Sequence, residues 1–338
     1  RWRTLLVPRW CRSVRRWPLW SCVAAPWAPW PRWALPIRAS KSLALTSADA
    51  APLRALAWRT SGTGEGPLIV LFHGGGMFAG SPTMLFEPCR SIALAFEGAV
   101  VLAPSYRLAA EHAWPAAVSD TRCALEWLAD HAAELKVDPS KGFIVGGFSA
   151  GAMLAAVAAS EAHFNKLRYD ITGTLLGLPW LMNCDSVPER YRSLWKSRDD
   201  AACGEPGMTA KDLLDALDAD PRSPLFSPLN HPRGLAGLPR TWIQAVGRDL
   251  FRDDAVVYHH ALADGGVDAH LEVFDYFCRP WHARGQNPSR PAAHGRHPLA
   301  PGPRPRSLSC PVHASSITSF LTLIIHPVAH LPLYFGQI

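Results

Sequence analysis

Short apolar runs alternate with stretches of helical spacing along the middle of the chain. Between Pro115 and Leu135, for example, Ala, Leu and Trp residues recur every three or four positions. Such alternation predicts strands joined by helices, and therefore an α/β fold whose mostly parallel sheet has helices on both faces. The expected strands are LIVLF, GAVVLAP, GFIVGG, TGTLLGLPWL, RTWIQAVG and HLEVFD.

A polar stretch at residues 183–221 interrupts this alternation without adding a strand. It is rich in Asp, Arg and Lys, and it contains one helix-like segment, AKDLLDALDAD. Insertions of this kind lie over the carboxyl ends of the strands in α/β sheets, where ligands also bind. We therefore interpret the stretch as a small cap that selects the substrate.

Composition divides the 338 residues into three regions. Residues 1–48 hold eight Arg, one Lys, seven Trp and no acidic residue, and residues 276–338 hold six Arg, six His, ten Pro and no acidic residue. All 28 Asp and Glu therefore lie in residues 49–275. We expect a folded domain at 49–275 between two flanks without regular structure, because repeated prolines interrupt any helix there.

The flanks give the chain its net charge of +6, which first suggests a nucleic acid or a membrane surface as partner. We expect neither, because the Arg residues lie in Pro-broken segments without a recognition motif, and His and Pro interrupt the apolar run 317–335. Mitochondrial targeting through the acid-free N-terminal segment stays open beside the cytoplasmic location that we favour. The eight Cys show no metal-ligand spacing, so no metal site is expected.

The pentapeptide Gly147-Phe148-Ser149-Ala150-Gly151 has the G-x-S-x-G form, at the point where a predicted strand ends and a helix begins. A serine in that sharp turn presents its hydroxyl at the edge of the sheet, and the glycines let the turn pack closely. Taken alone, the motif is equally typical of a tight strand-to-helix connection.

The four residues that follow the predicted strand LIVLF favour a catalytic interpretation. They are His73, Gly74, Gly75 and Gly76, and consecutive glycines let backbone N–H groups face a developing oxyanion. Gly74 and Gly75, together with Ala150, would then form the oxyanion hole. We interpret His73 and Gly76 as support for this loop, with action of His73 as a base as the alternative.

A nucleophilic serine of this kind needs an acid and then a histidine, in that order along the chain. Asp249 follows the strand RTWIQAVG after one intervening residue, so we expect it at the same edge of the sheet as Ser149. Asp253 and Asp254 fall on the helix beyond it. The alternative for Asp249 is an aspartate that only caps this helix.

These motifs resemble the hormone-sensitive-lipase-like family of α/β-hydrolases, which includes many bacterial and fungal carboxylesterases. The resemblance implies an α/β-hydrolase fold, Ser149 as the nucleophile, Asp249 as the acid, and hydrolysis of small-molecule esters without a cofactor. Phe148 is a small departure, since many members carry Asp there. The resemblance covers about residues 67–275 and rests on HGGG at 73–76, YRLAAEHAWPAAVSD at 106–120, GFSAG at 147–151, SPL at 223–225 and GRDLFRDD at 247–254.

The histidine is the large departure from the family pattern. Family members place it in a short turn a few residues after the last strand, whereas this chain continues as YFCRPWHARG and then as a Pro-rich tail. His282 is the nearest candidate for the base. We interpret His259 and His260, on the helix after Asp249, as ordinary histidines.

Two functions therefore stay open. One is a serine carboxylesterase that acts on short to medium acyl esters through an acyl-enzyme intermediate. The other is an impaired hydrolase fold without a proper catalytic histidine, which at most binds a small hydrophobic ligand.

Overall fold

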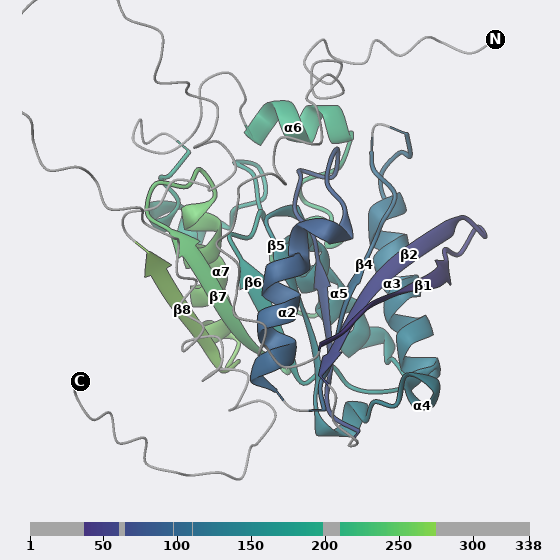
Figure 1. Ribbon diagram of the computed structural model, residues 1–338. Coiled ribbons are helices and arrows are strands. Elements are labelled where there is room, and N and C mark those ends of the chain that lie inside the picture. The colour runs from purple at the N-terminus through teal and green to yellow at the C-terminus, as the bar shows by residue number, and fades with distance from the viewer. Residues whose placement is uncertain (1–36, 61–64, 97, 110, 199–209, 275–338) are drawn as a thin grey trace, which may run out of the picture.

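The computed structural model describes residues 37–60, 65–96, 98–109, 111–198 and 210–274. These residues form one eight-stranded sheet with helices on both faces (Figure 1). Its strands are β1 (Ile37–Thr46), β2 (Pro52–Thr60), β3 (Leu68–Phe72), β4 (Val100–Pro104), β5 (Phe143–Phe148), β6 (Gly173–Gly177), β7 (Arg240–Val246) and β8 (Ala269–Phe274). They lie in the spatial order β1-β2-β4-β3-β5-β6-β7-β8.

The sheet is antiparallel at one edge and parallel elsewhere. β1 pairs with β2 and β2 with β4 in antiparallel register, and the pairs from β4-β3 to β7-β8 are parallel. Parallel strands end at the same edge of a sheet, so the loops after β3, β5 and β7 open on one side. The predicted α/β fold with a mostly parallel sheet is confirmed.

Strand β1 consists of residues that were expected in the N-terminal flank. It pairs with β2 from Ile37 to Thr46, and the Leu45 side chain is 2% exposed. Leu43 and Leu45 alternate with polar or small residues, which is the period-two signal of a half-buried strand. The acid-free composition of residues 1–48 masked this signal. The sheet therefore begins at residue 37 and not at residue 49.

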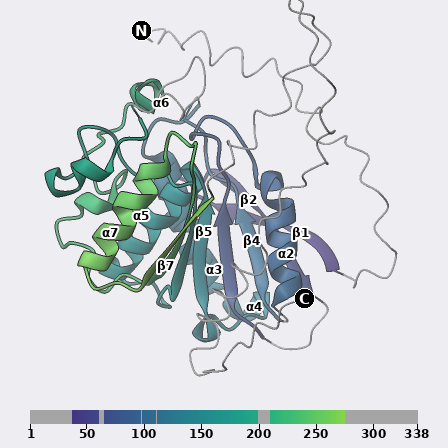
Figure 2. The same ribbon diagram turned by 90° about the vertical axis from the view of Figure 1, so that its left-hand side faces the viewer.

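The helices form two layers (Figure 2). One face of the sheet carries α2 (Phe86–Ala95), and the other carries α3 (Ala116–Asp130), α5 (Ala150–Asn165) and α7 (Arg252–Asp264). Strand β3 shows the division, because Leu68 and Val70 pack with α5 whereas Ile69 and Leu71 pack with α2. The shorter elements are α4 (Ala132–Leu135), α6 (Ala210–Leu217), η1 (Pro82–Leu85), η2 (Pro139–Lys141), η3 (Glu189–Leu194) and η4 (Pro228–Asn230).

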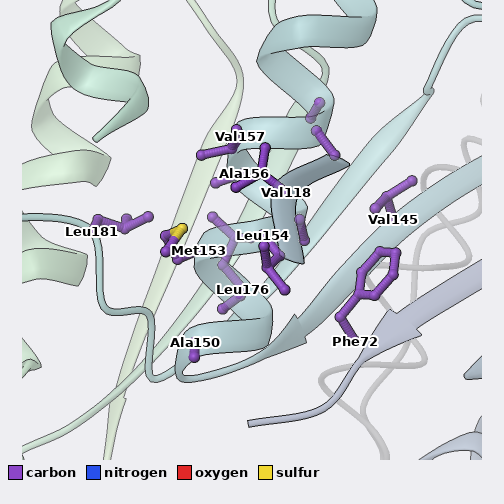
Figure 3. Close-up of a cluster of buried hydrophobic side chains, with 14 of the residues drawn as sticks. Phe72, Val118, Val145, Ala150, Met153, Leu154, Ala156, Val157, Leu176 and Leu181 are labelled. Carbon is purple, nitrogen blue, oxygen red and sulfur yellow. The ribbon is translucent and has the colours of Figure 1, made fainter. Parts of the chain in front are cut away.

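Helix α5 is buried on almost every side along residues 150–160. Its many Ala side chains let it lie close to β5 and β6, while Met153, Leu154 and Val157 fill the space around it (Figure 3). A helix that is apolar around its whole circumference belongs in a core. Because α5 begins directly after Ser149, this packing fixes the serine relative to the sheet.

Candidate active site

Ser149 occupies the turn between β5 and α5, and its side chain is buried. Its backbone has φ 57° and ψ −119°, a combination that costs a residue other than glycine about 1–3 kcal/mol. The Ser149 N–H donates to the Gly177 carbonyl at 2.8 Å, and the Ser149 carbonyl accepts from the Ala152 N–H at 3.0 Å. Strand β6 and helix α5 therefore hold the strained turn from both sides.

Glycine is required on both sides of Ser149. A Cβ atom on Gly147 would lie 2.5 Å from the carbonyl oxygens of Phe72 and Gly151. A Cβ atom on Gly151 would overlap the carbonyl oxygen of Phe72. The G-x-S-x-G spacing therefore reflects close backbone contact between the end of β3 and the start of α5.

The glycine loop after β3 runs beside the serine. A Cβ atom on Gly74 would lie 3.3 Å from the Ser149 Cβ atom, so the Gly74 backbone lies directly against Ser149. Gly75 and Gly76 have φ angles of +125° and +62°, which other residues rarely adopt. A Cβ atom on Gly75 would overlap the Ala79 carbonyl. Only glycines allow the loop to take this path.

His73 lies beneath this loop and is 1% exposed. Its ring stacks on Tyr106 with the ring centroids 4.2 Å apart, and its Nδ1 donates to the Gly74 carbonyl at 2.9 Å. The Tyr106 hydroxyl donates to the His73 carbonyl at 2.8 Å. Burial lowers the pKa of His73 to about 4, so its ring is neutral at pH 7. These contacts favour support of the loop over general-base catalysis by His73.

An ion pair holds Tyr106 in its place below the loop. The next residue, Arg107, donates from Nη2 to the Asp120 carboxylate of α3 at 2.7 Å and from Nε at 2.9 Å, while its backbone N–H reaches the same carboxylate at 2.8 Å. Asp120 is fully buried. The sequence motif contains these residues, but no role was assigned to them. The sequence signal that could have indicated a role for Asp120 was its position on the buried face of a predicted helix, where an unpaired aspartate is rare.

Asp249 lies in the turn between β7 and α7, and it is 2% exposed. Its Oδ1 accepts from the Phe251 N–H at 2.9 Å. The N-cap residue of α7 is Phe251, so Asp249 precedes the capping position. β6 lies between β5 and β7, and two strand spacings separate the ends of β5 and β7 by roughly 10 Å. That distance leaves room for an imidazole between Ser149 and Asp249.

The two aspartates after Asp249 bind the cap segment. Asp253 and Asp254 lie on the first turn of α7, as expected, and both are buried. The Asp253 carboxylate accepts from the backbone N–H groups of Lys196 and Ser197, each at 2.6 Å. No function was assigned to these aspartates from the sequence. The sequence signal that could have indicated a role for them was the presence of two adjacent acidic residues in the first turn of a predicted helix.

Helix α6, from the expected cap, lies above the carboxyl ends of the strands (Figure 1). A Cβ atom on Gly76 would lie 3.2 Å from a methyl group of Leu213, and Leu213 is buried. The apolar face of α6 thus covers the glycine loop next to Ser149. Residues 199–209, which precede α6, lie outside the described residues.

His282 also lies outside the described residues, so its expected contacts with Ser149 and Asp249 stay a prediction. The structure does show where the chain leaves the sheet. At the end of β8, the Phe274 carbonyl accepts from the Gly247 N–H at 2.9 Å. Gly247 is two residues before Asp249, so the end of β8 lies beside the turn that carries Asp249.

His259 and His260 lie on α7, as expected. His259 Nε2 donates to the Ala269 carbonyl of β8 at 3.2 Å, and burial lowers the pKa of His259. Among the described residues, no three His, Cys, Asp or Glu gather as metal ligands would. No helix in the same ranges is long and apolar enough to cross a membrane.

A parallel sheet with a strained serine between β5 and α5 and a glycine loop after β3 defines an α/β-hydrolase. A family model described as alpha/beta hydrolase fold matches residues 69–282. The chain belongs to this family, in its hormone-sensitive-lipase-like branch. The family expected from the motifs is therefore confirmed.

Several known proteins are similar to this chain. Esterase LipI of Mycobacterium tuberculosis is 33% identical over 205 residues, 60% of this chain and 62% of LipI. An AB hydrolase superfamily protein of Schizosaccharomyces pombe is 30% identical over 181 residues, 53% of each protein. The structure of a hyperthermophilic esterase from the archaeon Pyrobaculum calidifontis has a TM-score of 0.59 at 30% identity, covering 71% of this chain and 77% of that one. This chain thus spans about half the length of the yeast relative and less than two thirds of LipI.

Proposed function

We propose that the chain is a serine carboxylesterase that hydrolyses short to medium acyl esters of small molecules without a cofactor. The observation that carries this proposal is the strained turn at Ser149, against which the Gly74 backbone lies. A backbone strain of this size persists only where the surrounding structure enforces it, and it is typical of functional sites. The esterase names of LipI and of the archaeal protein support the same chemistry.

Ser149 Oγ attacks the ester carbonyl while the catalytic histidine takes its proton. The tetrahedral intermediate carries its negative charge on the former carbonyl oxygen. N–H groups of Gly74, Gly75 and Ala150 would stabilise this oxyanion, and within the described ranges no acceptor pairs with them. The histidine then protonates the leaving alcohol, and an acyl-enzyme remains. A water molecule, deprotonated by the same histidine, attacks the acyl-enzyme and releases the carboxylic acid and the free serine.

We assign the base to His282 and its orienting acid to Asp249. The family match extends to residue 282, so it includes this histidine. From Phe274 to His282 the chain has eight residues, which span up to roughly 26 Å when extended, enough to return over the strand ends. The hydrogen bond from the Gly247 N–H to the Phe274 carbonyl, two residues before Asp249 in the chain, supports this assignment.

Replacement of the nucleophile tests the proposal. Ser149→Ala should abolish hydrolysis of a p-nitrophenyl ester series and covalent labelling by a fluorophosphonate, because the labelled hydroxyl is gone. Ser160→Ala is the matched control, since Ser160 is a buried serine of α5, the helix that begins directly after Ser149, and its hydroxyl has no hydrogen-bond partner among the described residues. Labelling of Ser149→Ala at the wild-type rate would refute the assignment.

Replacement of His282 separates the esterase from an impaired hydrolase. If His282 is the base, His282→Ala should lower kcat by about 10⁴-fold or more, while the exposed His260→Ala leaves it unchanged. Robust turnover of His282→Ala would show that another base serves Ser149. A wild-type chain that reacts with neither ester nor fluorophosphonate would favour the impaired hydrolase.

A further inference from the structure

We propose that Arg198 of the cap is a positioning residue that holds the turn of the catalytic acid Asp249. The inference rests on the proposed function, in which Asp249 orients the base. It assigns to the cap a part in catalysis besides covering the site.

Arg198 contacts the two residues that directly follow Asp249. Its Nη1 donates to the Leu250 carbonyl at 3.1 Å, and its guanidinium carbon lies 4.3 Å from the centroid of the Phe251 ring. The Phe251 N–H is the group that donates to Asp249 Oδ1. Arg198 therefore restrains both the carbonyl next to Asp249 and the residue that binds the Asp249 carboxylate.

The same guanidinium is anchored on its other side by Met182, directly before the cap, and by α7. Arg198 Nη2 donates to the Met182 carbonyl at 3.0 Å and lies 3.0 Å from both oxygens of the Asp254 carboxylate. The Arg198 side chain is 9% exposed, so water competes little for these contacts. A planar guanidinium with five donors is suited to binding several fixed acceptors at once.

Asp254 supplies the fixed point of this arrangement. It is fully buried and also accepts from the N–H groups of Leu181 and Met182 and from the Trp195 indole at 2.9 Å. Burial raises the pKa of the Asp254 carboxyl, and the charge of Arg198 acts in the opposite direction. Three donors thus orient one carboxylate, and that carboxylate orients Arg198.

A second cap residue binds the same carbonyl. Ser197 Oγ donates to the Leu250 carbonyl at 2.9 Å, and Ser197 is fully buried. The backbone N–H of Ser197 is bound to Asp253. Two consecutive cap residues, Ser197 and Arg198, therefore both donate to the carbonyl of Leu250, the residue directly after Asp249. Contacts that served only to hold the cap closed would not need to converge on this carbonyl.

The test compares variants that keep the positive charge beside Asp254. Arg198→Lys preserves the charge, but a lysine cannot reproduce the fork that reaches Leu250 and Met182 together. We expect kcat for a p-nitrophenyl ester to fall about 10- to 100-fold, because displacement of a catalytic group by about 1 Å costs that much. KM should change less than about twofold, since substrate binding is not altered.

Two further variants provide a weaker perturbation of the same contact and a control. Ser197→Ala removes one of the two donors to the Leu250 carbonyl, and it should lower kcat in the same direction by a smaller factor. Arg192→Lys is the matched control, because Arg192 is an exposed cap arginine that pairs with Glu189 at 2.9 Å. It should keep the wild-type kcat and KM.

Hydrogen exchange gives a readout that does not depend on activity. In Arg198→Lys, amides of residues 249–252 should exchange at least about tenfold faster, while those of β5 and α5 keep their protection. Wild-type kcat together with unchanged exchange in a folded Arg198→Lys would overturn the inference. A wild-type protein that hydrolyses no ester would refute the proposed function instead, and exchange at residues 249–252 would still decide whether Arg198 holds the turn.

Discussion

Burial of His73 makes the free energy of unfolding of the domain depend on pH. The folded chain holds the pKa of this imidazole at about 4, below the ordinary value of 6.5. Between these values the unfolded chain binds a proton that the folded chain excludes, so stability is complete above pH 6.5 and decreases as the pH falls toward 4. The shift corresponds to about 3 kcal/mol.

We therefore expect the wild-type free energy of unfolding to fall by about 3 kcal/mol more than that of His73→Gln between pH 7 and pH 4. Urea unfolding at both pH values measures this difference. His112→Gln, at an exposed histidine, serves as the control and should follow the wild type. Equal pH dependence of the wild type and His73→Gln would contradict a neutral His73 in the folded chain.

The residues of the site differ in how far the sequence predicts them. The sequence reveals Gly147, Gly151 and the glycine loop, because close backbone contact leaves no room for a side chain at these positions. The requirement for glycine therefore appears as a short local motif. Arg198 is not detectable in that way. Its partners lie at positions 182, 250 and 254, and only the folding of the cap onto α7 brings them together.

At the scale of elements, the central strands were predictable because parallel strands covered on both faces are continuous apolar runs, such as LIVLF. Strand β1 was not, because its polar residues and its acid-free surroundings resemble the flank that precedes it. Its burial depends on pairing with β2 and packing against α3, which lies about 70 residues further along the chain. Long-range packing of this kind leaves only a weak local pattern.

The position of α6 over the glycine loop leads to a prediction about acyl length. Leu213 is buried against Gly76, so Leu213→Ala should open space beside the ester carbonyl that Ser149 attacks in the proposed mechanism. We expect kcat/KM for a p-nitrophenyl octanoate, relative to the acetate, to rise about tenfold. Lys211→Ala, at an exposed position of the same helix, should leave this ratio unchanged. An unchanged ratio for Leu213→Ala would show that α6 does not limit the acyl group.

At the scale of the whole molecule, the change in composition and the edge of the folded domain fall at different places. Acidic residues begin at Asp49, whereas the sheet begins at Ile37. The charge boundary is set by which residues are ionisable, and the edge of the sheet is set by which residues can pair and bury a side chain. Composition therefore placed the start of the folded domain too late along the chain.

Two truncations test where the domain begins. Removal of residues 1–36 should leave the thermal midpoint within about 2 °C of the wild type, because six prolines interrupt every helical stretch of that segment. Removal of residues 1–46 also deletes β1 and the buried Leu45, which costs about 2–3 kcal/mol of apolar burial. That loss corresponds to a decrease of roughly 5–10 °C for a domain of this size, measurable by circular dichroism. If both truncations lower the midpoint equally, residues before Ile37 stabilise the domain and its edge lies further toward the N-terminus.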